Sequence, residues 1–165
     1  MNFPGLDRAD PQSLRAELLR QEGALVIQRF DNGTAIALGM QMMDSAEREA
    51  LPLTVDITRC QQQLFHVALA GTVKDNDDWV RRKREMVYRM GHSSWFAAVE
   101  SRLNGEDLVR DYGLDPASFS GEGGGFPIFV RDVGLVGTAA VSGLASADDH
   151  KFVVAELAKF LGVTL

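Results

Sequence analysis

The chain has 165 residues, which is within the usual size of one domain, and we expect a single domain over residues 1–165. Its 17 Lys and Arg residues against 23 Asp and Glu residues give a formal net charge of −6. That balance argues against a protein held to nucleic acid by a basic surface. The hydrophobic fraction of 45% excludes global disorder and supplies enough apolar side chains for a core.

The single cysteine, Cys60, can form neither an intramolecular disulfide nor a CxxC metal site, and it fits a reducing compartment. Residues 1–11 contain no apolar run, so we expect no signal peptide. No stretch approaches the roughly 20 apolar residues of a membrane span. We therefore expect a cytoplasmic protein that contacts neither membranes nor nucleic acid.

The first predicted elements are a helix and a hairpin. Asp10-Pro11 is typical of a helix N-cap followed by the first helical residue, and Gly23 is typical of the helix end. Asn32-Gly33 favours a tight type I′ turn, so we predict a β-hairpin over residues 24–42.

Two helices are predicted next. The first covers residues 53–70, with Cys60 on its apolar side as a small buried residue and His66 on its exposed, polar side. The second begins at the acidic residue Asp75 and continues to Val99.

The second predicted helix, residues 75–99, has an apolar stripe that includes Lys83, where the lysine stem reaches out to solvent or its ammonium meets a buried anion. A second stripe on this helix interleaves aromatic and basic residues: Arg81, Arg84, Tyr88, His92 and Trp95. Such a face is unusual for a solvated helix. We expect a subunit, another element of the chain or a planar ligand to cover it.

A glycine-rich run, Gly121–Pro127, precedes a predicted hairpin over residues 126–142. Ser146 and Asp149 then fit a capping box at the start of the last helix, which places His150 on the solvated side. The order is helix, hairpin, two helices, hairpin, helix. It predicts an α+β fold with a mainly antiparallel sheet flanked by helices.

No motif fixes a chemistry. The three histidines lie in no metal-binding spacing and GxSxG is absent, so no catalytic constellation is visible. Gly123, Gly124 and Gly125 either let a ligand approach closely or let a neighbouring helix pack closely. His92 is either a packed or interface residue or a ligand-binding one, and both interpretations stay open.

Three segments of the last third of the chain form a recognisable pattern: Gly123–Ile128, Val133–Gly143 and Asp148–His150. This pattern resembles that of the haem-degrading domain family, of the HbpS/GlcG-like type, and the resemblance extends from about Leu14 to Phe160. It implies a PAS- or profilin-like arrangement and assembly into homo-oligomers. It also implies haem as one cofactor that such a domain binds, since some relatives bind it.

The leading hypothesis is therefore a domain that binds a small molecule, haem or another flat anionic cofactor, within a homo-oligomer. The glycines would allow close approach, Phe126 and Trp95 would stack on the ligand, and basic side chains would pair with its propionates. The residues assigned to this site are His92 and His66 as first and second iron ligands, Gly123, Gly124, Gly125, Phe126, Trp95, Arg81, Arg84 and Lys83.

The alternative is an oligomeric assembly module without a cofactor, in which the aromatic and basic stripe is a subunit interface. A third interpretation, an enzyme that breaks down haem, has less support from the residues.

Overall fold

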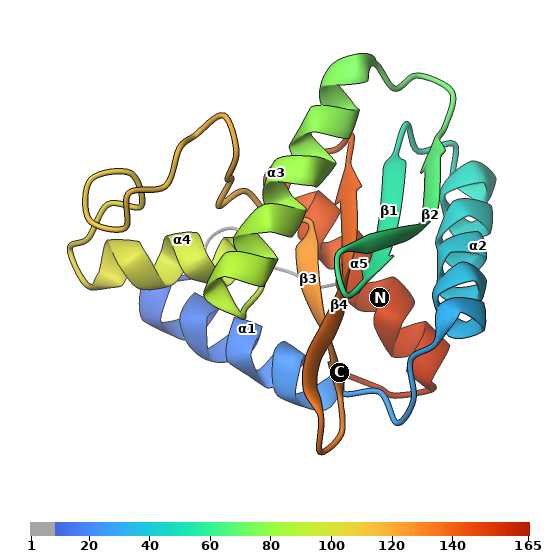
Figure 1. Ribbon diagram of the computed structural model, residues 1–165, viewed down its shortest axis with the longest axis horizontal. Coiled ribbons are helices and arrows are strands. Elements are labelled where there is room, and N and C mark those ends of the chain that lie inside the picture. Colours follow the sequence, from blue (N-terminus) through green and yellow to red (C-terminus); the bar gives the residue numbers. More distant parts are fainter. Residues whose placement is uncertain (1–8) are drawn as a thin grey trace.

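The computed structural model describes residues 9–165; most of the segment on which the signal-peptide prediction rests, residues 1–8, lies outside the described part. Five helices and four strands follow one another along the described chain (Figure 1). In chain order they are α1 (Pro11–Ala24), α2 (Asn32–Arg48), β1 (Thr54–Arg59), β2 (Gln62–Ala68), α3 (Lys74–Met90), α4 (Ser94–Leu103), β3 (Gly125–Val130), β4 (Gly134–Ser142) and α5 (Ser146–Leu161).

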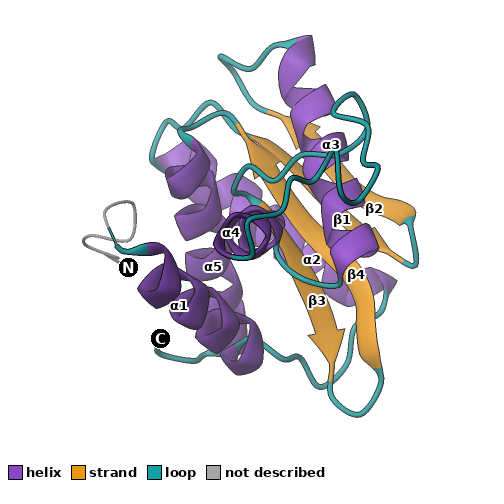
Figure 2. Cartoon of the chain, turned by 90° about the vertical axis from the view of Figure 1, so that its left-hand side faces the viewer, coloured by secondary structure: helices purple, strands orange, loops and turns teal. Residues whose placement is uncertain are grey.

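The four strands form one antiparallel sheet in the order β2-β1-β4-β3. Helix α3 lies over one face of this sheet, α2 and α5 lie over the other, and α1 packs against α4 (Figures 1 and 2). The predicted α+β class with an antiparallel sheet flanked by helices is confirmed.

The two faces of the central strands differ in polarity. Side chains of Val55, Ile57 and Val141 belong to the apolar core beneath α2 and α5. Because side chains alternate along a strand, the residues between them face α3, and most of these are polar. They are buried all the same: Thr54, Asp56, Thr58, Thr138 and Ser142. The face of the sheet beneath α3 is therefore buried and largely polar.

The predicted hairpin over residues 24–42 is wrong, because α2 occupies most of that range. The Asp31 carboxylate accepts hydrogen bonds from the Thr34 amide and hydroxyl, both at 2.9 Å, and so caps the helix. From there Ala35, Leu38 and Met42 are buried at helical spacing. A single bridge from Ile27 to β3 is the only strand-like pairing of the described residues in this range.

The predicted helix over residues 53–70 is also wrong, since β1 and β2 form a hairpin there. The turn between them places Cys60 and Gln61 at φ 49° and 65°, and Cys60 is exposed instead of buried. Strand β1 is buried on both faces. Its alternation of apolar and polar residues therefore does not distinguish a solvent-exposed face from a buried face.

The long helix predicted to reach Val99 is interrupted. Gly91, at φ 72°, ends α3 in the left-handed conformation, and the Ser93 hydroxyl accepts from the Phe96 amide to begin α4. The aromatic and basic stripe is thus not continuous: His92 lies in the connection and Trp95 on the next helix.

The α3 part of that stripe is covered by another element of the chain. Arg84 reaches Asp56 of β1 at 3.3 Å, and the Tyr88 hydroxyl lies 2.7 Å from that of Thr58. The β1–β2 hairpin therefore partly covers Arg84 and Tyr88, whereas the Arg81 side chain stays 40% exposed.

The strands predicted within residues 126–142 and the last helix are confirmed, but the capping box is wrong. Ala145 is the N-cap of α5, and the Ser146 hydroxyl instead accepts from the Gly123 amide at 2.7 Å. The Asp149 carboxylate forms an ion pair with Lys83 instead of a cap, and His150 is fully buried, not solvated.

Candidate functional site

The structure distributes the predicted site residues over separate surfaces. Lys83 borders a cleft between α3 and α5, while His66, Arg81 and Arg84 border a second between α3 and β2. His92 borders a third between α1 and α4. They do not form one site.

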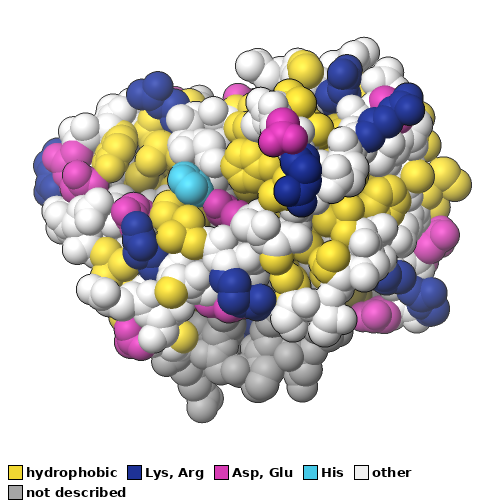
Figure 3. All heavy atoms as spheres, turned by 90° about the horizontal axis from the view of Figure 1, so that it is seen from below, with side chains coloured by type: hydrophobic (Ala, Val, Ile, Leu, Met, Phe, Trp, Pro, Cys, Tyr) yellow, Lys and Arg dark blue, Asp and Glu magenta, His cyan; other side chains and the backbone are white. Residues whose placement is uncertain are grey.

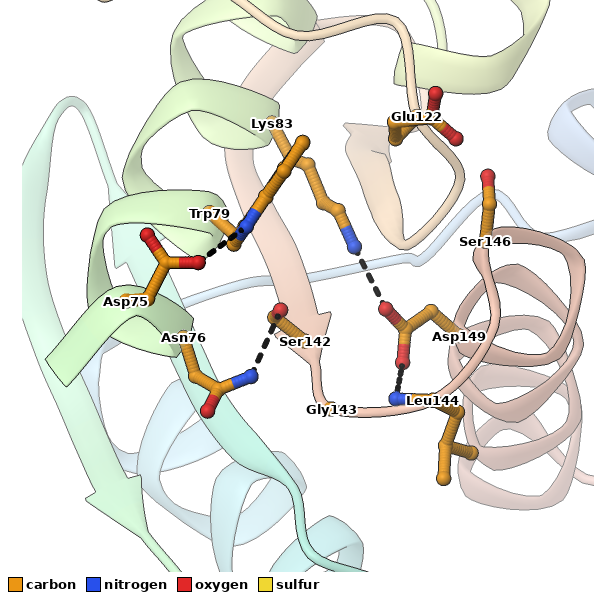
Figure 4. Close-up of a pocket in the computed structure, with 10 residues that line it drawn as sticks. All are labelled: Asp75, Asn76, Trp79, Lys83, Glu122, Ser142, Gly143, Leu144, Ser146 and Asp149. Carbon is orange, nitrogen blue, oxygen red and sulfur yellow. Dashed lines mark hydrogen bonds and ion pairs between the residues drawn. The ribbon is translucent and has the colours of Figure 1, made fainter. Parts of the chain in front are cut away.

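The α3–α5 cleft has a volume of about 280 Å³ (Figure 4). It is enclosed by the first turns of α3, the end of β4, the start of α5 and the loop before β3. Its lining residues are Asp75, Asn76, Trp79, Lys83, Glu122, Ser142, Gly143, Leu144, Ser146 and Asp149. Of the residues that the sequence assigned to a ligand site, only Lys83 lines this cleft.

A buried ion pair forms one wall of the α3–α5 cleft. The Lys83 ammonium donates to Asp149 at 2.7 Å and to the Val141 carbonyl at 3.0 Å, and the two side chains are 3% and 2% exposed. Burial lowers the pKa of Lys83 and raises the pKa of Asp149, while each charge counteracts the shift of the other. Of the two alternatives that the sequence left open for Lys83, the structure has the ammonium at a buried anion.

The glycines before β3 are packed against protein. A Cβ atom on Gly124 would lie 2.9 Å from the Lys83 ammonium, and one on Gly125 would lie 2.9 Å from the Lys83 carbonyl. A Cβ on Gly123 would lie 2.3 Å from the Ser146 carbonyl. Phe126 is 0% exposed, within the core. These residues let α3, α4 and α5 pack closely on β3, and Phe126 has no surface on which a ligand stacks.

The α3–β2 cleft, of about 250 Å³, contains the second predicted ligand, His66. Its Nδ1 lies 3.2 Å from the buried carboxylate of Asp56, and its Nε2 lies 3.3 Å from Asp77. Gln63 and Arg84 also bind Asp56. Nδ1 of His66 is therefore in hydrogen-bond contact with Asp56, whereas the approach of Nε2 to Asp77 makes no hydrogen bond.

The α1–α4 cleft, of about 260 Å³, contains the first predicted ligand, His92. Its walls are mainly apolar and aromatic, with one ion pair, and comprise Arg15, Leu19, Met90, His92, Phe96, Ala97, Glu100, Ser101 and Tyr112. The underside of the molecule carries hydrophobic side chains around an exposed histidine (Figure 3).

One ring nitrogen of His92 is fixed by a buried carboxylate. Glu22 accepts from His92 Nδ1 at 2.6 Å and from the Ser93 amide at 2.8 Å. The hydrogen bond to Glu22 raises the pKa of His92. Nε2 of His92 has no partner among residues 9–165, and the side chain is 39% exposed. The ring also lies 4.3 Å, centroid to centroid, from that of Phe96.

Trp95 and His150 form a separate contact behind this surface. Their ring centroids are 5.2 Å apart in an edge-to-face arrangement, and His150 Nε2 lies 2.9 Å from the Gln21 side-chain oxygen. Burial lowers the pKa of His150 to about 3, so the ring is neutral. Trp95 therefore packs between helices and does not line the His92 cleft.

Sequence reasoning missed Glu22 and the role of Asp149. Glu22 is on α1, 70 residues before His92, and no local pattern links the two. Among the described residues no group of three or more His, Cys, Asp or Glu is arranged to hold a metal ion, and no helix is long and apolar enough to cross a membrane.

The arrangement defines a class of small α+β domains with a four-stranded antiparallel sheet between helices. The crystal structure of the Ybr137w protein shares it with a TM-score of 0.82 at 24% identity, over 90% of this chain and 87% of that one. The structure of a PduOC:haem complex shares it with a TM-score of 0.67 at 15% identity, over 80% and 94% of the two chains. At these identities the likeness establishes the fold alone.

Sequence comparison gives the family. A UPF0303 protein of Streptomyces coelicolor is 43% identical over 147 residues, which are 89% of this chain and 93% of the relative. The family model described as "Haem degrading protein HbpS-like" matches residues 30–158. The chain belongs to the HbpS-like family, as the sequence motifs predicted.

Proposed function

We propose that this protein binds haem, or a flat carboxylate-bearing molecule like it, in the α1–α4 cleft, and that it works as a homo-oligomer. The observation that carries the proposal is the state of His92, whose Nδ1 is held by buried Glu22 while Nε2 is left without a partner.

The residues of the cleft fit such a ligand. Because a carboxylate oxygen accepts only, Nδ1 of His92 carries the proton and Nε2 of the neutral ring keeps its lone pair. Metal-binding histidines commonly have this arrangement, in which the second nitrogen donates to a carboxylate that orients the ring and increases its basicity. Bound haem supplies an iron that accepts such a nitrogen.

The walls of the α1–α4 cleft suit the rest of a porphyrin. Leu19, Met90 and Phe96 offer apolar contact, and Arg15 at the rim offers a cation to a propionate. Arg15 is already paired with Glu100, so a propionate would compete with that carboxylate. A structural relative was crystallised as a haem complex, which supports this ligand class for the fold.

The homo-oligomer is supported by apolar side chains on the free face of α2. Ile36 and Met40 are 43% and 49% exposed on consecutive turns of that helix. Large apolar side chains grouped on a surface are typical of contact faces. Sedimentation velocity tests this part, and a monomer at micromolar concentration would contradict it.

Titration with haemin tests the binding proposal. We expect a saturable shift of the Soret band that is lost or weakened at least tenfold in His92→Ala. His66→Ala is the matched control, since it removes the other partly exposed histidine, and it should bind as the wild type does. A Soret shift that persists in His92→Ala and disappears in His66→Ala would show that haem binds in the α3–β2 cleft instead. Absence of binding in an oligomeric wild type would favour the assembly module.

A further inference from the structure

The α3–α5 cleft contains polar groups that the proposed haem site does not use. One of them is a buried hydroxyl at the end of the sheet. Ser142 is 4% exposed, and the only hydrogen bond that its hydroxyl makes within residues 9–165 is the one it accepts from the Asn76 side-chain amide at 3.4 Å. Its own proton has no acceptor among residues 9–165. Figure 4 shows this hydroxyl pointing into the cleft, towards Asn76.

A second buried hydroxyl lies beside Ser142. The strand register places Thr54 directly opposite Ser142, so both side chains are on the α3 face of the sheet. Thr54 is 0% exposed, and its hydroxyl has no hydrogen-bond partner. Buried polar groups in folded proteins are nearly always paired. Thr54 does not line the cleft, so Ser142 is the hydroxyl whose unused proton a bound molecule can reach.

The α5 side of the cleft adds further donors. The N-cap, Ala145, has no side chain that bonds the first turn, and the amides of Ser146 and Ala147 have no partner in the described chain. The hydroxyl of Ser146 accepts from Gly123, which leaves its proton free to donate. Unpaired amides at a helix N-terminus favour an anion. Together with Ser142, they make this end of the cleft a place for a carboxylate.

The α3 side of the cleft offers a negative charge instead of hydrogen-bond donors. Asp75 is exposed at the rim, and one of its oxygens accepts from the Trp79 indole at 2.9 Å. One face of the indole is covered by Arg82, whose guanidinium lies 3.8 Å from the ring centroid. A carboxylate beside an aromatic ring is a favourable place for an ammonium group. Glu122 is not part of this side, because it lies exposed at the other end of the cleft, near Ser146 (Figure 4).

The Lys83–Asp149 pair does not change this division, because its two charges cancel within the wall between the two ends. Trp79 and Leu144 supply the apolar surface of the cleft. The volume of about 280 Å³ is close to the lower limit of roughly 300 Å³ for small-molecule sites.

We propose that the α3–α5 cleft binds a small zwitterion, an amino acid with an apolar side chain. Its carboxylate lies against Ser142, Ser146 and the free amides of α5. Its ammonium group lies at Asp75 beside Trp79. The site is distinct from the His92 cleft and does not depend on haem.

Isothermal titration of the full chain with L-leucine tests the proposal, using 4-methylpentanoate and isopentylamine as matched probes that lack the amine and the acid. We expect saturable binding of leucine and at least tenfold weaker binding of each single-charge probe. No saturable binding of leucine, or equal binding of isopentylamine, would overturn the proposal.

Two variants test which residues bind the carboxylate and which bind the ammonium group of the ligand. Ser142→Ala removes the buried donor, and Asp75→Asn removes a charge while keeping an oxygen that accepts from Trp79. We expect each to weaken leucine binding about tenfold or more, whereas Ser118→Ala and Asp78→Asn, which lie outside the cleft, should change it less than twofold. Asp75 is exposed, so its variant should fold even if Ser142→Ala does not. Unchanged affinity in Asp75→Asn would refute the assignment of the ammonium.

Discussion

The buried pair of Lys83 and Asp149 gives a prediction whose magnitude follows from the structure. The two side chains meet at 2.7 Å, almost without exposure, and join α3 to α5. Replacing Lys83 with Met leaves the carboxylate with the Leu144 amide, at 3.0 Å, as its principal partner. Removing one member of a buried pair costs about 3–5 kcal/mol, because the remaining charge is desolvated and unpaired. We expect Lys83→Met to reduce the free energy of unfolding by that amount.

The pair itself should contribute much less. Burial shifts the pKa of each partner towards its neutral form, which shows that desolvation opposes the attraction between the charges. The double variant Lys83→Met with Asp149→Leu should therefore be more stable than either single variant. Urea unfolding followed by circular dichroism at pH 7 measures all four proteins. A loss below about 1 kcal/mol in Lys83→Met, or additive losses in the double variant, would refute this reasoning.

Three further predictions concern the packing and the exposure of single residues. Gly39→Ala should cost about 1–3 kcal/mol in thermal or urea unfolding, because the new Cβ would lie 2.3 Å from the ring of Phe65. Gly23→Ala, with no atom within 4 Å, should cost nothing, and equal losses would contradict the α2–β2 packing. Burial lowers the pKa of His150 to about 3. The contribution of His150 to the free energy of unfolding should therefore be complete above pH 6.5 and decrease as the pH falls towards 3, because only the unfolded state gains the proton. If the free energy of unfolding of His150→Gln depended on pH as that of the wild type does, this origin would be contradicted. The Cys60 thiol, exposed in the β1–β2 turn, should react fully with Ellman's reagent in the native protein, and protection until unfolding would contradict that turn.

Sequence reasoning succeeded where the signal was local. The Asp10 side chain accepts from the amides of Gln12 and Ser13 at the start of α1, as its N-cap pattern predicted. It failed where one local signal fits two structures. Asp31-Asn32-Gly33 suits both a tight hairpin and a helix N-cap, and the buried residues at helical spacing that follow decide for the helix.

The candidate sites depend on contacts between distant segments, which explains why they were predicted only in part. Lys83 was singled out because a lysine within an apolar stripe needs a partner, but Asp149 is 66 residues away and also fits a local cap. His92 was singled out as part of a helical face that the structure interrupts at Gly91. Its link to Glu22 of α1 requires the tertiary fold.

Resonance Raman spectroscopy of the ferrous haem complex shows whether His92 binds the iron. We expect an iron–histidine stretching band in the wild type and in His66→Ala, and its loss in His92→Ala. A band that persists in His92→Ala, or a wild-type complex without one, would contradict it.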